Sequence, residues 1–326
     1  MRVLWVATKS PFPAVDGGRL ATAETLAALA RIGVEGVLVA PAVGRADVTL
    51  PGWRIEHVPP AARWSQVARW RGRGSALVSR HVQPAVRQAV ASWLARAAFD
   101  VVHAEQLYAW PQCAPAGAAH VPIVLRAQNV EQDVLVHRPS RLPRAIVELD
   151  RRRLATFEAS VVQAAAVTIA LTAADTARLA ALAGPTAAVL HIPPPFPAEL
   201  PPGPPLTGTP PVVLFGSDGW FPNRTGATWF LQTVWPAVRA RLPRGQLHVI
   251  GLPGTTNAAA RVLHHAAPPD SRAAFPHGAI LVVPSQTASG IRMKILEAWA
   301  RGVVVVATSA AVIGLDIAVG VEMDER

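Results

Sequence analysis

The sequence has one cysteine, Cys113, in 326 residues. A single cysteine excludes a disulfide within the chain and a zinc site built from cysteine thiolates. Such usage is typical of a reducing compartment, so we expect a cytoplasmic protein. No apolar run is long enough to span a bilayer. The apolar core of "MRVLWVATKSPFP" (1–13) is very short, so we do not expect a signal peptide.

Charged residues are also few, at 16 %, whereas hydrophobic residues make up 51 % of the chain. This composition is ample for buried cores, and the length favours two domains. The formal charge of +10 favours an anionic partner, which could be a nucleotide, a nucleic acid or a lipid surface. Acidic tracts and low-complexity nucleic-acid-binding tails are absent, so we expect no nucleic-acid partner.

Two common nucleotide-binding signatures are missing. "DGG" at 16–18 has neither the G-x-G-x-x-G spacing nor the Lys-Ser/Thr pair of a P-loop. The neighbouring His264 and His265 lack further ligands at metal-binding spacing. We therefore predict no metal site and no bound cofactor.

The first half of the chain alternates strand-like and helix-like segments. Apolar runs of strand length at 2–8 and 34–41 flank a loop and a helical segment at 20–33. This is a βαβ unit, which predicts a parallel sheet. The pattern recurs, with further predicted strands at 100–105, 121–128 and 166–172.

A proline-dense segment, "IPPPFPAELPPGPPLTGTPP" (192–211), can hold neither a helix nor a central strand. We interpret it as a linker between an N-terminal domain (1–191) and a C-terminal domain (212–326). The second domain has its own α/β series, with predicted strands at 212–217, 246–251, 279–285 and 303–309 and helices at 223–243 and 291–301. Two doubly wound domains would face a cleft, and ligands bind such sheets beyond the carboxyl ends of their strands.

The segment "TASGIRMKILEAWARG" (287–302) carries two cations, Arg292 and Lys294, in the first turn of its predicted helix. A helix N-terminus is already partly positive, so cations there are unfavourable unless an anion is bound. At 3.6 residues per turn, Lys294, Glu297 and Arg301 share one stripe of an otherwise apolar helix. The stripe faces a charged ligand, or it is an exposed salt-bridged face.

Four segments in this order resemble the retaining family-4 group of GT-B glycosyltransferases (glycosyl transferases group 1). They are "TKSPFPAVDGGRLATAETLAALA" (8–30), "LRAQNVEQDV" (125–134), "FGSDGWFPNRTGATWFL" (215–231) and "VVPSQTASGIRMKILEAWARGVVVVATSAAVIGL" (282–315). The last resembles the branch with SG-x-R-x-K-x-LE in place of a two-glutamate motif; Ser289 stands where the first glutamate is missing. The resemblance implies the GT-B fold, two Rossmann-like doubly wound parallel-sheet domains facing a cleft. The sequence ends shortly after Gly314–Leu315, so we expect the C-terminal helices that the resemblance implies to be missing from it.

The resemblance also implies a donor site. The diphosphate of a nucleotide sugar is expected at Gly290, Ile291, Arg292 and Lys294, and the nucleotide ribose at Glu297. GT-B enzymes need no metal for the departing diphosphate, so the two cations would stabilise this leaving group directly.

The first domain would bind the acceptor and the transferred sugar. Gly17 and Gly18 would allow close backbone approach to a sugar, although a plain turn before a helix is the alternative. Asn129 and Glu131 follow a predicted strand, where a solvated loop or a capping pair is equally consistent with the pattern. The expected acceptor and sugar loop is Gly17, Gly18, Arg19, Asn129 and Glu131, and the catalytic candidates are Gly18, His103 and Asn129. A lone histidine such as His103 is at least as often structural.

The segment "RWSQVARWRGRGSALVSR" (63–80) interleaves tryptophans with arginines. Such helices lie on anionic membranes, bind single-stranded nucleic acid or pack on a core. The resemblance favours membrane contact, because acceptors in this family are often lipid-linked.

We therefore predict a glycosyltransferase of the hexosyltransferase type, metal-independent, in the cytoplasm or at the inner face of the membrane. It would transfer a sugar from a nucleoside-diphosphate sugar to a glycan or lipid-linked acceptor, with retention, as in polysaccharide biosynthesis. Two alternatives remain. One is an impaired remnant that binds a nucleotide or a membrane, and the other is a nucleotide-sugar epimerase on the same fold.

Overall fold

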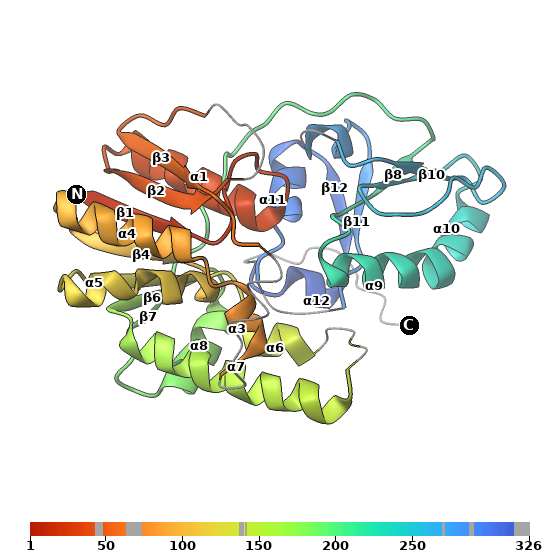
Figure 1. The fold of residues 1–326 in the computed structure, drawn as a ribbon. Coiled ribbons are helices and arrows are strands. Elements are labelled where there is room, and N and C mark those ends of the chain that lie inside the picture. Colours follow the sequence, from red (N-terminus) through yellow and green to blue (C-terminus); the bar gives the residue numbers. More distant parts are fainter. Residues whose placement is uncertain are drawn as a thin grey trace.

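The protein is represented by a computed structural model that describes residues 1–42, 48–62, 74–136, 140, 142–268, 271–286 and 290–315. It contains one parallel sheet of seven strands and one of five, which occupy the two halves of the molecule (Figure 1). Helices pack against both sheets. The predicted pair of parallel α/β domains is thus confirmed.

The first sheet has the strand order β3-β2-β1-β4-β5-β6-β7. Its strands are β1 (Arg2–Ala7), β2 (Glu35–Pro41), β3 (Trp53–Val58), β4 (Val101–Glu105), β5 (Ile123–Ala127), β6 (Val167–Ala170) and β7 (Val189–His191). Its helices are α1 (Gly17–Arg31), α3 (Ala76–Arg80), α4 (Pro84–Arg96), η1 (Leu107–Cys113), α5 (Ala114–Ala118), α6 (Glu131–Val136), α7 (Arg144–Ala164) and α8 (Ala173–Ala183). The strand order reverses between β1 and β4, which makes their carboxyl ends the switch point of this sheet.

Both faces of this sheet are apolar because helices cover both of them. Leu4 and Val6 of β1 belong to one buried cluster, and the alternate residues Val3 and Trp5 belong to another that includes Leu26 of α1. Strands buried on both faces read as continuous apolar runs, which is why the sequence revealed β1, β2 and β4.

The second sheet has the order β10-β9-β8-β11-β12. Its strands are β8 (Pro211–Phe215), β9 (Gln246–Ile250), β10 (Val262–His265), β11 (Ile280–Val283) and β12 (Val304–Ala307). Its helices are α9 (Phe221–Trp229), the π-helical η2 (Phe230–Val234), α10 (Trp235–Arg241), η3 (Ser271–Ala274), α11 (Met293–Ala300) and α12 (Ser309–Val312). The order reverses between β8 and β11, which defines a second switch point.

Three helices differ from the prediction. The helix predicted at 223–243 is interrupted by η2, directly before Pro236, which has no N–H for the carbonyl four residues earlier. The helix predicted at 291–301 begins at Met293, because Arg292 has an extended ψ of 82°. Conversely, α1 begins at Gly17 rather than Leu20, because the side chain of Asp16 accepts the N–H of Arg19 and caps the helix.

The segment predicted as a linker lies against the second domain. The N–H of Leu200 donates to the carbonyl of Ala300 over 2.7 Å, and the N–H of Gly203 donates to Phe275 over 2.8 Å. Strands of the first sheet end at His191 and those of the second begin at Pro211. The domain boundaries themselves stay a prediction. Among the residues that the structure describes, no helix is both long and apolar enough to cross a bilayer.

Candidate functional site

The carboxyl ends of the two sheets meet between the domains. Helix α1 packs against α11, and a Cβ at Gly17 would lie 3.4 Å from the Cβ of Met293. A Cβ at Gly290 would lie 2.2 Å from Oδ1 of Asn129, so this position requires glycine. The structure thus brings the predicted donor segment into contact with the predicted sugar loop.

Glu105, the last residue of β4, is buried at the switch point of the first sheet. Its carboxylate accepts hydrogen bonds from Gln128 over 2.6 Å and from Arg126 over 3.3 Å. Burial alone would raise the pKa of Glu105, but the charge of Arg126 and the bonds from His103 and Gln128 outweigh it, so this pKa is below its ordinary value. Glu105 is therefore a fixed negative charge whose counter-charge comes from within the first domain.

Gly18 and two glutamines form the wall of a small cavity beside Glu105. Gln106 donates from Nε2 to Oε1 of Gln128 over 2.7 Å, and a Cβ at Gly18 would lie 2.6 Å from the same Oε1. Gln106 has φ of 69°, a left-handed conformation that is strained for a residue other than glycine. The polar lining of the cavity comprises Thr8, Lys9, Asp16, Arg19, Thr22, Glu105 and Gln106.

Gly17, Gly18 and Arg19 do not form a loop, as the sequence suggested, but the first turn of α1. His103 lies in the middle of β4, where its ring stacks on Trp5 with centroids 3.5 Å apart. Burial lowers the pKa of His103, against the opposing effect of Glu105, whose Oε2 lies 3.4 Å from Nε2. His103 is therefore held inside the first domain, whereas Gly18 reaches the cavity.

Asn129 and Glu131 begin the segment after β5, at the same edge of the sheet. The hydroxyl of Tyr108 donates to Glu131 over 2.8 Å, and burial raises the pKa of Glu131 against this bond. The N–H of Glu131 donates to the carboxylate of Glu158 on α7 over 2.7 Å. Burial raises the pKa of Glu158 to about 7. Two carboxyl groups with raised pKa thus lie next to each other at this edge of the first sheet.

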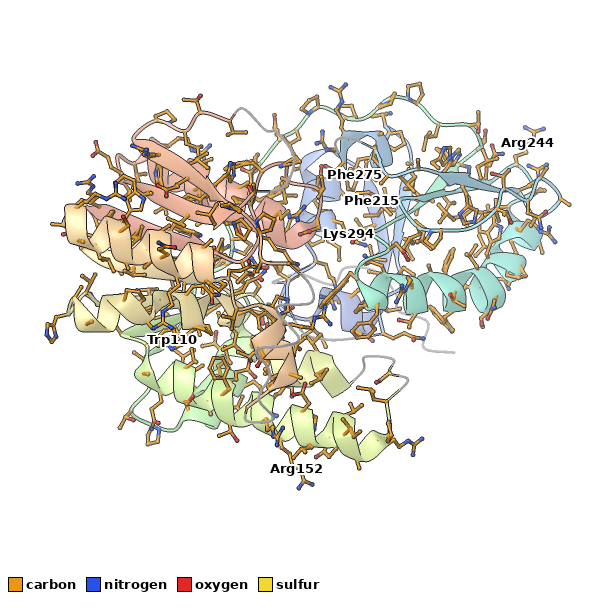
Figure 2. All side chains as sticks on the ribbon, viewed as in Figure 1. Trp110, Arg152, Phe215, Arg244, Phe275 and Lys294 are labelled. Atoms are coloured by element: carbon orange, nitrogen blue, oxygen red, sulfur yellow. The ribbon has the colours of Figure 1, made fainter. Side chains whose placement is uncertain are left out.

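Lys294 is buried beside the second switch point, on the side of its domain that faces the first (Figure 2). Its Nζ donates to the carbonyl of Phe215, at the end of β8, over 2.5 Å and to Oδ1 of Asn223 over 3.1 Å. Both acceptors are neutral. Burial, together with the charge of Arg292, lowers the pKa of Lys294 to about 7.

Arg292 adds a second, largely buried cation. Its guanidinium donates to the carbonyl of Gly290 and to Oγ of Ser285, each over 3.3 Å. Burial lowers the pKa of Arg292, and the negative charge of Asp175 opposes this shift. The four positions predicted for a diphosphate therefore lie together, with two cations among them; Ser289 falls outside the described residues.

Glu297 is held by one of its two carboxylate oxygens. Oε1 accepts from Oγ of Ser271 over 2.5 Å and from the guanidinium of Arg301 over 2.9 Å. Every hydrogen bond to Glu297 within the described part of the chain ends on Oε1, which leaves Oε2 able to accept another donor. The stripe of Glu297 and Arg301 is thus salt-bridged, as one hypothesis held, but it is buried rather than solvated.

Several residues of this arrangement were not singled out from the sequence. They are Glu105, Gln106, Gln128, Asp175, Asn223 and Ser271. Glu105 ends a predicted strand and Gln106 and Gln128 lie directly beyond one, so position at the carboxyl edge of the sheet could have found them. Nothing in the sequence marks Asp175 or Ser271. Among the described residues there is no group of three or more His, Cys, Asp or Glu side chains that could hold a metal ion.

Comparisons with known proteins agree with this architecture. Residues 210–320 match the model of a family described as glycosyl transferases group 1. None of the curated proteins matches the chain. The solved structure of sucrose-phosphate synthase from Thermosynechococcus elongatus is similar, with a TM-score of 0.68 and 16 % identity over 96 % of this chain and 81 % of that one.

Two further structures are similar over nearly the whole chain. Anabaena HepE in complex with UDP-glucose has a TM-score of 0.61 and 15 % identity, over 94 % of this chain and 80 % of that one. WaaG, a glycosyltransferase involved in lipopolysaccharide biosynthesis, has a TM-score of 0.57 and 13 % identity, over 96 % and 82 %. The chain therefore has the two-domain GT-B fold, and its second domain matches the glycosyl transferases group 1 family.

Proposed function

We propose that the protein is a glycosyltransferase that transfers a hexose-type sugar, with retention, from a nucleoside-diphosphate sugar to a glycan or lipid-linked acceptor. The observation that carries this proposal is the pair of buried cations, Arg292 and Lys294, at the carboxyl ends of β8 and β11. Burying an ammonium group against neutral oxygens is costly unless an anion joins it. An anion bound beside Arg292 and Lys294 would offset this cost.

The diphosphate of the donor binds at Gly290, Ile291, Arg292 and Lys294. When the bond between the anomeric carbon and the diphosphate oxygen breaks, its electron pair goes to the diphosphate. The acceptor oxygen forms the new bond to the anomeric carbon, and its proton passes to the departing diphosphate. Negative charge grows on the leaving group in this step, and Arg292 and Lys294 stabilise it in a site that excludes water. The chain's own cations do this work, so no metal ion or cofactor is needed.

Glu297 binds the ribose of the nucleotide. Ser271 and Arg301 hold Oε1 of its carboxylate, and Oε2 accepts a ribose hydroxyl. Anabaena HepE, which has the same fold, forms a complex with UDP-glucose. This supports a nucleotide sugar as the donor class.

The first domain contributes the sugar and acceptor side. Gly18 admits the sugar closely, the network of Glu105, Gln106 and Gln128 holds this wall rigid, and Arg19, Asn129 and Glu131 offer polar contacts. Of the three catalytic candidates, Gly18 and Asn129 are favoured over His103, because His103 is enclosed in the sheet. Gly17 serves the contact with Met293.

Contact with the inner face of the membrane through 63–80 is part of the proposal. Residues 63–73 lie outside the described residues, but Arg153 of α7 donates to the carbonyl of Gly74 over 3.4 Å. Apolar side chains are exposed at the start of the same helix: Ile146 and Leu149 in the first turns of α7, and Leu142 just before it, are 48 to 59 % exposed. Apolar side chains next to arginines suit a lipid surface with anionic headgroups, which fits a lipid-linked acceptor.

Product analysis tests the proposed reaction. The protein is incubated with a panel of nucleotide sugars and lipid-extract or glycan acceptors, in excess chelator. A transferase yields free nucleoside diphosphate and a glycosylated acceptor that keeps the donor's anomeric configuration. A changed donor would instead identify an epimerase, and donor binding without any product would identify an impaired remnant.

A further inference from the structure

The anion site assigned above already contains a carboxylate from the other domain. The N–H of Gly290 donates to Oδ2 of Asp175 over 3.1 Å, in a buried hydrogen bond between residues 115 positions apart. The negative charge of Asp175 also acts on the guanidinium of Arg292. Asp175 therefore meets two of the groups that would bind the donor diphosphate.

The first domain presents Asp175 in a fixed position. Asp175 lies in the first turn of α8, and its own N–H donates to Oγ1 of the capping Thr172 over 3.0 Å. A carboxylate is favourable in the first turn of a helix, where the partial charge of the helix is positive. Its side chain is only 5 % exposed. The first domain thus holds the carboxylate of Asp175 in place before any ligand binds.

The two domains pack closely around Asp175. A Cβ at Gly290 would lie 2.2 Å from Oδ1 of Asn129, and a Cβ at Gly314 would lie 2.3 Å from Cγ2 of Thr172. Both contacts join the two domains beside Asp175. A diphosphate that accepts the N–H of Gly290 must displace Asp175, and two like charges at one site repel each other. The carboxylate of Asp175 must therefore leave this position when the donor diphosphate binds.

We infer that Asp175 is an interdomain latch: in the empty protein its carboxylate takes the place of the donor diphosphate at Gly290 and Arg292 and joins the two domains there. Donor binding competes with this carboxylate and displaces it. This inference rests on the proposed function, since it assumes that Gly290 and Arg292 bind the diphosphate. It adds a regulatory role for a residue of the first domain that the transfer reaction itself does not require.

The competition has a measurable consequence. A hydrogen bond to a charged group corresponds to a factor of roughly ten to a hundred in an equilibrium constant. If the latched state predominates by that factor, the apparent affinity for the anion is reduced by the same factor. Removing the carboxylate should therefore strengthen anion binding, which is the opposite of what loss of a ligand-binding residue would do.

The test compares Asp175→Ala and Asp175→Asn with the natural protein, using inorganic pyrophosphate and a panel of nucleoside diphosphates in isothermal titration calorimetry. We expect Asp175→Ala to bind pyrophosphate about tenfold or more tightly, and Asp175→Asn to lie between, because its amide oxygen still accepts the N–H of Gly290. The matched control is Asp133→Asn. Asp133 pairs with Arg178 of the same helix α8 at the surface, over 3.0 Å, so this variant should leave the affinity unchanged.

Small-angle X-ray scattering of the empty proteins provides a second readout. We expect Asp175→Ala, which lacks the hydrogen bond that joins the two domains, to have a larger radius of gyration than the natural protein. Thermal unfolding identifies a variant that fails to fold. If Asp175→Ala fails to fold, the pyrophosphate affinity of Asp175→Asn is compared with that of the natural protein. Equal or weaker pyrophosphate binding by folded Asp175 variants, beside a natural protein that binds it, overturns the latch alone. Absence of binding in every folded protein overturns the proposed function as well.

Discussion

Replacing Lys294 by methionine should stabilise the empty protein while removing its affinity for the donor. Burial and the charge of Arg292 lower the pKa of Lys294 from 10.5 to about 7. In the unfolded chain the ammonium group regains its ordinary pKa, so that state binds more protons between about pH 7 and pH 10.5. Stability therefore rises with pH across this window, and the destabilisation is fully present below it.

The shift corresponds to about 5 kcal/mol at most, because each pKa unit represents about 1.4 kcal/mol. Methionine also loses the hydrogen bonds to Phe215 and Asn223, which are worth about 1 kcal/mol each. We therefore expect a net gain of about 2–3 kcal/mol below pH 7, seen as a melting temperature several degrees higher at pH 6.5. The gain should shrink towards pH 10.

Circular dichroism melts at both pH values, paired with calorimetric titration of a nucleoside diphosphate, measure the two effects. The control is Arg244→Met, since Arg244 is an exposed cation of the same domain, at the end of that domain away from Lys294 (Figure 2). The chain has one other lysine, Lys9. With two lysines, NMR of labelled ammonium groups can also follow the pKa of Lys294 directly. If Lys294→Met melts at a lower temperature at pH 6.5, or still binds the nucleotide with the natural affinity, the assignment of Lys294 as an uncompensated anion-binding charge is wrong.

Three further predictions concern the same cleft. Binding of a nucleoside diphosphate at pH 8 should take up close to one proton, because the bound anion raises the pKa of Lys294 above its value of about 7 in the empty protein. Calorimetric titrations in buffers of different ionisation enthalpy measure this uptake. Zero uptake would mean that the anion does not reach Lys294. Glu297→Gln should weaken nucleoside diphosphate binding by about 1–3 kcal/mol but spare pyrophosphate, whereas equal losses would contradict the ribose assignment. Gly18→Ala would bring a Cβ within 2.6 Å of Gln128, so transfer should fall in product assays while donor affinity stays unchanged; an equal fall in donor affinity would argue that Gly18 shapes the donor site instead.

The sequence predicts the sheets better at their centres than at their edges. Central strands such as β1 and β8 are apolar on both faces and form recognisable runs. The edge strands β3 and β10 contain polar residues, such as Arg54 and Glu56 in one and His264 and His265 in the other. One face of such an edge strand is less covered by the rest of the fold, so polar and apolar residues are mixed along it. The sequence analysis therefore missed β3 and β10.

The candidate site could also be predicted only in part from the sequence, but for a different reason. Position beyond a predicted strand singled out Asn129, and helix periodicity grouped Lys294 with Glu297; their roles stay predictions. Neither signal could tell that the ammonium group of Lys294 meets a backbone carbonyl, because a carbonyl leaves no trace in residue identity. Likewise, the contact between Gly290 and Asp175 depends on how two domains meet, which no local pattern encodes.

The two halves of the cleft differ in how their buried charges are balanced, and this difference indicates which half awaits a charged ligand. In the first domain the carboxylate of Glu105 is paired with Arg126 over 3.3 Å, so its charge is neutralised within the fold. In the second domain the bonds of Lys294 end on neutral oxygens. A neutral sugar or acceptor suits a wall whose charges are already paired, because it adds hydroxyl groups and no net charge. A diphosphate suits the other wall, because it supplies a negative charge to the buried ammonium group of Lys294, whose hydrogen-bond acceptors are neutral. The charge balance of Glu105 and Lys294 thus supports the proposed division of labour, in which the first domain binds the sugar and the second binds the diphosphate.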